Sequence, residues 1–271
     1  MTLIYILIFF IFLEFLLRNY FEFFKDNDNS NNIKRIPNLS LKRNYIVDSL
    51  SSENKNSELD EKIGWRLINN SEISVKVTAP YINENLNYKY KINEFGARSS
   101  NFTGKKKTIG FFGCSITYGH GLNEQSTFAN RTCEKINDYE YLNYGVAGYS
   151  LYQSFLKYKE VSKKINFEKI IFTVHKDLER RNTSSLSWLK MINRFWGVPG
   201  LIYFKGLRLK FRPRKYLRIF PSKFKILMLV EFLINFLIYS IGDNNLIKKE
   251  TNEYLLNQIK KECIKNNSEL I

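Results

Sequence analysis

The chain has 271 residues, 44% of them hydrophobic and 15% aromatic, which is enough to bury a sizeable core and excludes a disordered chain. Three cysteines, Cys114, Cys133 and Cys263, are too few for a disulfide scaffold, and two histidines argue against a His-rich metal centre. A formal net charge of +16 is typical of proteins that bind nucleic acid or an anionic membrane surface.

The N-terminal tract favours the membrane as partner and argues against nucleic acid. Residues 3–17 are apolar except for Glu14, and phenylalanines continue the tract to Phe24. A helix over residues 2–24 would be about 34 Å long, enough for a bilayer core of about 30 Å. The tract has no basic flank before it and no cleavage site after it. We therefore predict an uncleaved single-pass transmembrane anchor over residues 1–24; a signal peptide and a buried N-terminal helix are the alternatives.

The next segments differ in composition. Residues 25–61 are polar and rich in Asn, Ser and Lys, which predicts a linker. Alternating patterns at 74–78 and 88–92 predict short strands in an N-terminal extension over residues 62–106. Residues 182–245 predict a basic-aromatic insertion, and its apolar run 226–241 predicts an amphipathic helix that packs on the domain or lies on a membrane.

From residue 107 onward, strand and helix patterns alternate. Short apolar runs at 108–112, 139–142 and 169–174 predict buried strands. Helical patterns follow at 126–136, at 150–165 with Ser150 as cap, and at 247–265 with Leu256, Ile259 and Cys263 on one face. This order predicts an α/β domain over residues 62–271, with a parallel sheet and helices on its faces.

Polar residues and glycines follow each predicted strand, where parallel sheets bind their ligands. The segments are Gly113-Cys114-Ser115, then Asn143-Tyr144-Gly145-Val146-Ala147-Gly148, then His175-Lys176-Asp177. A serine between a buried strand and a helix N-terminus suits ester chemistry, which needs a nucleophile and N–H donors for an oxyanion. Gly-x-Ser alone is common in turns, so the combination carries the interpretation.

Two of these segments resemble the SGNH (GDSL-type) hydrolase family. The first is Gly113-Cys114-Ser115-Ile116-Thr117-Tyr118-Gly119 and the second runs from Asn143 to Ser150; the apolar N-terminus and Asn93-Glu94-Phe95-Gly96-Ala97-Arg98 are similar to membrane-anchored members. The resemblance covers residues 62–181. It implies a flavodoxin-like three-layer parallel sheet and a serine esterase in a periplasmic or extracellular domain. The implied substrate is an acyl ester, with O-acetyl groups on a cell-envelope carbohydrate as a candidate, and no cofactor or metal is implied.

Carried over by position, the resemblance assigns Ser115 as nucleophile and the N–H groups of Ser115 and Gly148 as oxyanion donors. Cys114 stands where the family has a structural Asp, and a catalytic thiol is the less favoured interpretation. Lys176 stands where the family has an Asn that donates to the oxyanion. Such a donor contributes about 3–4 kcal/mol to the barrier, so we expect Lys176 to be a weaker substitute.

The family's C-terminal Asp-x-x-His block has no counterpart here, because no histidine follows His175. Residues 268–271 read as the start of a strand that would leave a sheet edge open. We therefore expect a fold incomplete at its C-terminus and a fragment of a longer enzyme. The alternative is a natural protein without the triad: a non-catalytic membrane-bound carbohydrate- or lipid-binding module, or a basic membrane-surface scaffold. Within the chain, His175 is a candidate base and His120 a weaker one.

Overall fold

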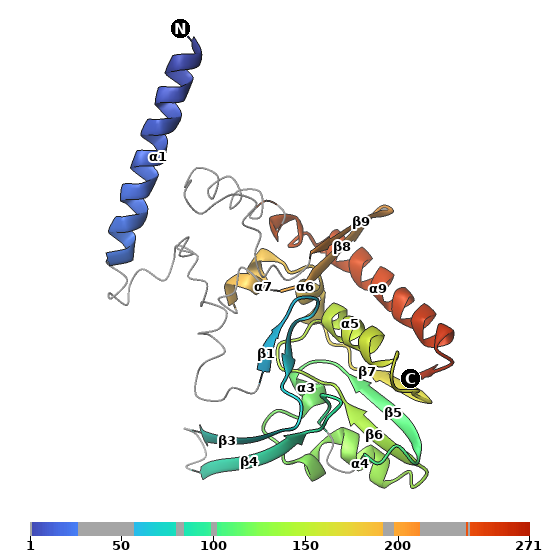
Figure 1. Ribbon diagram of the computed structural model, residues 1–271. Coiled ribbons are helices and arrows are strands. Elements are labelled where there is room, and N and C mark those ends of the chain that lie inside the picture. Colours follow the sequence, from blue (N-terminus) through green and yellow to red (C-terminus); the bar gives the residue numbers. More distant parts are fainter. Residues whose placement is uncertain are drawn as a thin grey trace.

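A four-stranded parallel sheet forms the centre of the domain in the computed structural model, which describes residues 2–26, 57–79, 84–98, 102–191, 198–211, 237 and 239–271 (Figure 1). Its strands are β5 (Lys107–Phe112), β6 (Tyr139–Asn143), β7 (Lys169–Phe172) and β10 (Glu269–Leu270), in the order β10-β7-β5-β6. All three pairings are parallel. The predicted parallel sheet is confirmed, including the short strand near residue 268.

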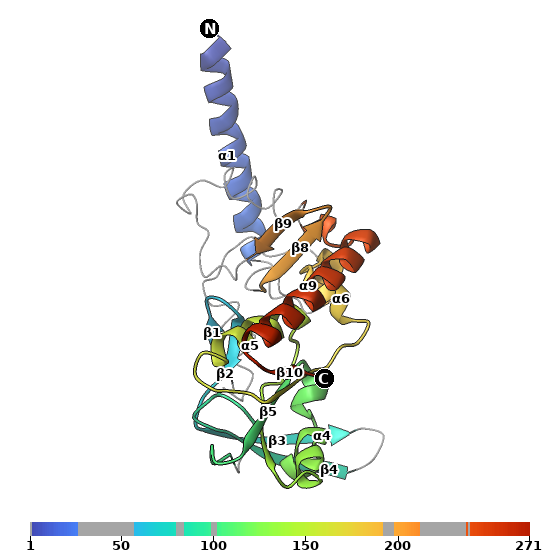
Figure 2. The same ribbon diagram turned by 90° about the vertical axis from the view of Figure 1, so that its right-hand side faces the viewer.

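Helices cover both faces of this sheet, because successive side chains of a strand point to opposite sides. Ile109 and Phe111 of β5 pack with Ala129 and Cys133 of α4 (Phe128–Glu134). Phe112 belongs to the larger cluster on the other face, with buried residues of α5 (Leu151–Val161) and α9 (Asn245–Lys265). Figure 2 shows α9 running along that face.

The helix ends follow local sequence. Ser150 caps α5 as predicted: its hydroxyl accepts from the N–H of Gln153, whose side chain accepts from the N–H of Ser150. One predicted core position is wrong. Leu256 is 40% exposed, and Leu255 is buried in its place. The buried face of α9 consists of residues four apart, Thr251, Leu255, Ile259 and Cys263, and Leu256 is turned off this face.

The N-terminal helix forms, but the predicted membrane span is not supported. Residues 2–26 make up α1 (Thr2–Asp26). Within the described part of the chain, no helix has both the length and the apolarity needed to cross a membrane. An ion pair lies on this helix, with Arg18 Nε 2.9 Å from Glu14 Oε1. The described residues therefore show a helix over this tract and give no support to a membrane span.

Two antiparallel hairpins precede the sheet. β1 (Ser57–Asp60) pairs with β2 (Gly64–Leu67), and β3 (Ser71–Ala79) pairs with β4 (Glu84–Ile92), which confirms the strands predicted at 74–78 and 88–92. Arg98 links the second hairpin to the sheet through bridges to Ile92 and Asn143. Strand β1 lies inside the segment predicted as a linker, and residues 27–56 lie outside the described residues.

The basic-aromatic insertion over residues 182–245 is described in part. It contains α7 (Leu186–Met191), β8 (Gly200–Phe204) and β9 (Leu207–Phe211), after α6 (Leu178–Asn182). Leu201 of β8 is buried in the cluster that contains α9, and Tyr203 stacks on Tyr254 with ring centroids 4.2 Å apart. Most of the run 226–241, predicted as an amphipathic helix, lies outside the described residues. The division into anchor, linker and domain stays a prediction.

Candidate active site

The loops that follow β5, β6 and β7 lie side by side at the carboxyl edge of the sheet. Backbone hydrogen bonds continue the strand pairing into these loops: the N–H of Val146 donates to the carbonyl oxygen of Gly113 (3.1 Å), and that of Thr173 donates to Phe112 (3.0 Å). The three segments that the sequence predicted to meet are therefore neighbours in space.

Two glycines allow this close approach. At Gly145, an added Cβ would overlap the backbone nitrogen of Tyr118 and lie 2.7 Å from the carbonyl carbon of Thr117. At Gly113, it would overlap the hydroxyl groups of Thr117 and Thr173, which are hydrogen-bonded to each other. Side chains are excluded at both positions because backbone and hydroxyl groups of α3 and of Thr173, which follows β7, occupy the space.

Ser115 is the first residue of α3 (Ser115–Tyr118), directly after the turn that ends β5, and its side chain is half-buried. The short helix ends at Gly119, whose φ of 72° is left-handed. Gly148 also has a left-handed φ, 82°, in the neighbouring loop. Within the described residues, no hydrogen bond leaves the N–H of Ser115 or of Gly148, and none involves the Ser115 hydroxyl. Both amides are available to a ligand.

His175 contacts the residue before Ser115. Its Nε2 lies 3.3 Å from Sγ of Cys114, which is 1% exposed. Burial and the charge of Arg181 lower the pKa of His175, and Asp177 opposes this shift. A lowered pKa favours the neutral imidazole, which is the state that a general base needs.

The side chains of His120 and Lys176, the other two predicted residues, form no hydrogen bond with Cys114 or Ser115 within the described residues. His120 is exposed, and its ring lies edge-on to Tyr88 with centroids 6.4 Å apart. Lys176 is exposed, and its ammonium group has no partner among the described residues. The roles of Ser115, Gly148, Lys176 and His175 stay predictions; the structure shows only where they lie.

Arg98 is a site-supporting residue to which sequence reasoning gave no role. It is 1% exposed, and its Nη1 donates to the carbonyl oxygens of Tyr118 (2.6 Å) and Gly119 (2.9 Å), while Nη2 donates to Leu122 (2.5 Å). The guanidinium carbon also lies 4.7 Å from the ring centroid of Tyr90. Burial lowers the pKa of Arg98. Its charge is balanced by the carbonyl groups at the end of α3, and the described residues provide no ion pair for it.

A second arginine supports the Gly148 loop. Arg181 of α6 donates through Nε to Asp177 (2.7 Å) and through Nη1 to the carbonyl oxygen of Tyr149 (3.4 Å), and its guanidinium carbon lies 4.3 Å from the ring centroid of Trp188. Burial alone would raise the pKa of Asp177, but its bonds to Arg181 and Arg180 outweigh burial and lower it. The signal that sequence reasoning missed was the acid-to-arginine spacing of four on a helix.

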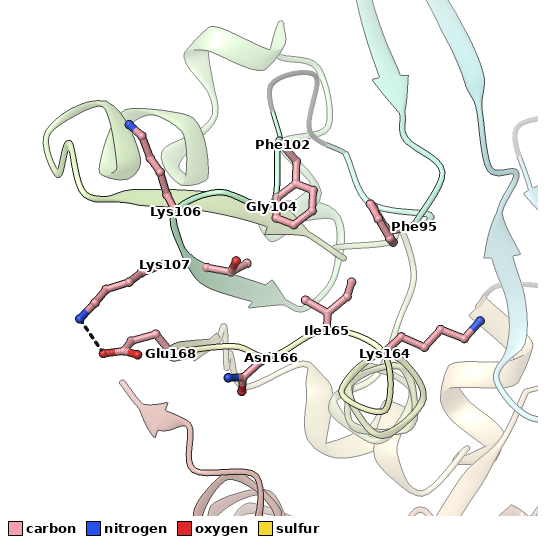
Figure 3. Close-up of a pocket in the computed structure, with 10 residues that line it drawn as sticks. Phe95, Phe102, Gly104, Lys106, Lys107, Lys164, Ile165, Asn166 and Glu168 are labelled. Atoms are coloured by element: carbon pink, nitrogen blue, oxygen red, sulfur yellow. Dashed lines mark hydrogen bonds and ion pairs between the residues drawn. The ribbon is translucent and has the colours of Figure 1, made fainter.

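A hollow of about 460 Å³ lies at the opposite end of the strands (Figure 3). Phe102 and Ile165 point into it, whereas the side chains of Lys106 and Lys164 extend away, and Lys107 is paired with Glu168 at 3.1 Å. Since Lys107 begins β5, this hollow is at the amino edge of the sheet and is separate from Ser115. Among the described residues, no cluster of three or more metal-ligating side chains is found.

No protein-family model and no curated protein matches the sequence. Among solved structures, the chain is similar to AlinE4, an SGNH-hydrolase family esterase, at 13% identity over 63% of this chain and 77% of that chain, with a TM-score of 0.30. It is also similar to a member of the lipolytic protein G-D-S-L family from Veillonella parvula DSM 2008, at 15% identity over 61% and 76% of the two chains, with a TM-score of 0.27. These scores are too low to decide fold or activity, so the function is inferred from the site.

Proposed function

We propose that the chain is a serine hydrolase of the SGNH type that acts on acyl esters, with Ser115 as nucleophile. The observation that supports this best is the convergence of three post-strand loops on the helix that begins at Ser115, with the N–H groups of Ser115 and Gly148 unused within the described residues. A nucleophile next to unused N–H donors is the arrangement that acyl transfer needs.

The proposed reaction has two halves. Ser115 Oγ attacks the ester carbonyl carbon while His175 accepts the hydroxyl proton, and the N–H groups of Ser115 and Gly148, with the Lys176 ammonium group, stabilise the oxyanion. Collapse of the tetrahedral intermediate releases the alcohol, which takes the proton from His175. Water then attacks the acyl-serine and releases the acid. The lowered pKa of His175, which favours the neutral ring, supports its assignment as the base.

Hydrolysis of p-nitrophenyl acetate by purified protein tests the proposal. Ser115→Ala is expected to lower kcat by about 10³-fold or more. Ser162→Ala, at the C-terminal end of α5, is the matched control and should leave turnover unchanged. If Ser115→Ala keeps the same ester turnover as wild type and Ser162→Ala, Ser115 is not the nucleophile.

The base and the substrate need separate measurements. His175→Gln is expected to lower kcat by about 10²–10⁴-fold, and unchanged turnover would place the base elsewhere. For the substrate, we propose O-acetyl groups on a cell-envelope carbohydrate, because this is what the motif resemblance implies. Acetate release from an acetylated polysaccharide, compared with a simple acetate ester, decides between a carbohydrate esterase and a general one.

A second candidate is a non-catalytic carbohydrate- or lipid-binding module. It is favoured by one observation: the Ser115 hydroxyl has no hydrogen bond to a base among the described residues. Glycan binding that is equal in wild type and Ser115→Ala, with no ester turnover in either, would support this module. Turnover that Ser115→Ala abolishes would exclude it.

A further inference from the structure

The contact between Cys114 and His175 joins two loops that follow neighbouring strands. Sγ of Cys114 and Nε2 of His175 are 3.3 Å apart, within the range of a hydrogen bond to sulfur, although the residues are 61 positions apart in sequence. Cys114 is held firmly: it packs in the main core cluster with Phe112 and Tyr144, and its carbonyl oxygen accepts the N–H of Tyr118 at 2.9 Å. The position of the thiol is therefore well defined, and its contact with Nε2 orients the imidazole ring.

The contact restricts which ring nitrogen of His175 can take part in catalysis. A neutral imidazole carries one N–H and one unprotonated nitrogen. Since Nε2 faces Cys114, only Nδ1 is left to accept a proton from another group. Nδ1 is the acceptor only if Nε2 keeps the hydrogen and donates it to the sulfur. The side chain at position 114 would thus select the tautomer.

We propose that Cys114 is a positioning residue, whose sulfur accepts the Nε2–H of His175 and leaves Nδ1 as the base for Ser115. This inference rests on the proposed function, in which His175 removes the Ser115 proton. It also explains how a thiol can stand at the position before Ser115 without being a nucleophile. At 1% exposure, the sulfur is closed to an ester, whereas Ser115 is half-buried and reachable.

The charges around His175 bear on which group can accept its Nε2–H. Arg181 and Asp177 of the following segment act on the ring in opposite directions, and Lys176 adjoins it in sequence. On its other side, the ring meets the buried thiol of Cys114, which packs among apolar core residues. A carboxylate at position 114 would instead favour the imidazolium, because an opposite charge within hydrogen-bonding distance stabilises the charged form. The identity of residue 114 should therefore set the pH at which His175 becomes a base.

Long-range ¹H–¹⁵N NMR of the imidazole rings in the substrate-free protein tests the tautomer directly. We expect Nε2 of His175 to be protonated and Nδ1 to have the shift of an unprotonated nitrogen. Cys114→Ala should mix the tautomers, and Cys114→Ser should restore the preference, since a hydroxyl oxygen also accepts. The matched control is Cys133→Ala, which removes another buried thiol, 8% exposed, on the far face of the sheet. An unprotonated Nε2 in wild type, or a Cys114→Ala spectrum identical to wild type, would overturn the proposal.

The pH dependence of ester turnover gives a second readout that a purely structural role would not move. Cys114→Asp is expected to shift the acidic limb of the kcat/KM profile upward by about one pH unit or more. If the acidic limb of Cys114→Asp is unshifted while His175→Gln is inactive, the positioning role of Cys114 is refuted and the role of His175 as base is not. If wild type shows no turnover, the proposed function fails, while the NMR result still decides whether Cys114 sets the tautomer.

Discussion

Replacing Arg98 by Met should test how the helix that begins at Ser115 is held in place. The guanidinium is the buried donor for three carbonyl oxygens, those of Tyr118, Gly119 and Leu122, at 2.5–2.9 Å. Methionine keeps much of the side-chain volume but donates nothing. The substitution therefore leaves the end of α3 and the following turn without their donor, while the aromatic rings around the side chain keep a neighbour.

The expected magnitude follows from two opposing terms. Hydrogen bonds to a charged group contribute about 1.5–3 kcal/mol each. Burial of the guanidinium without a carboxylate partner costs several kcal/mol, and the variant is relieved of that cost. We expect a net loss of about 3 kcal/mol in the free energy of unfolding, because three buried acceptors lose their donor at about 1–3 kcal/mol each and the relieved burial cost offsets part of that loss. For a domain of this size, this corresponds to a Tm lower by roughly 6–12 °C.

Urea and thermal unfolding measure the loss, and ester turnover measured well below the Tm shows whether Ser115 is displaced. Arg208→Met is the matched control, because Arg208 is exposed and its Nη1 donates to one hydroxyl, that of Tyr254, at 3.1 Å. That variant should change stability by less than about 0.5 kcal/mol. Equal stability of Arg98→Met and wild type would show that the cost of burying the charge cancels all three bonds, and would refute the reasoning.

Three further substitutions probe the site and its supports. Gly145→Ala should cost about 2 kcal/mol in urea unfolding and abolish ester turnover, because its methyl group would overlap the Tyr118 backbone. The control, Gly121→Ala, lies at φ 84° in open space and should cost about 1 kcal/mol while keeping turnover. Equal turnover in the two variants would contradict this packing. Ser150→Ala removes the cap of α5 and should cost about 1 kcal/mol in thermal unfolding, an effect that Ser162→Ala should lack. Asp177→Asn should be less stable than wild type at neutral pH. Because the folded pKa of Asp177 is lowered, its contribution is present above its ordinary pKa of about 3.9 and is lost as pH falls through the folded value, so the difference in Tm should shrink in acid; a difference that grows would reverse the sign.

The sheet and its helices could be predicted because the signals are local. The apolar runs of β5 and β6 are buried on both faces, and Ser150 carries its capping partner three residues away. The error at Leu256 has the same origin, since helical spacing alone does not say which of two neighbouring leucines faces the sheet. The N-terminal tract shows the limit: its apolar sequence predicts a helix correctly, while the predicted span is not supported.

Contacts between loops were harder to predict than the loops themselves. Strand order was enough to place His175 at the same edge as Ser115, but not to say which atom of the neighbouring loop it meets. That choice depends on the backbone of the turn after β5, where Cys114, with φ −96° and ψ −153°, is buried, while Ser115 begins the helix and stays accessible. If the turn were shifted by one residue, the hydroxyl would be buried and the thiol would lie at the start of the helix. In the mechanism we propose, the contact with sulfur leaves one ring nitrogen of His175 for chemistry, so activity there should depend on residue 114 as well as on Ser115.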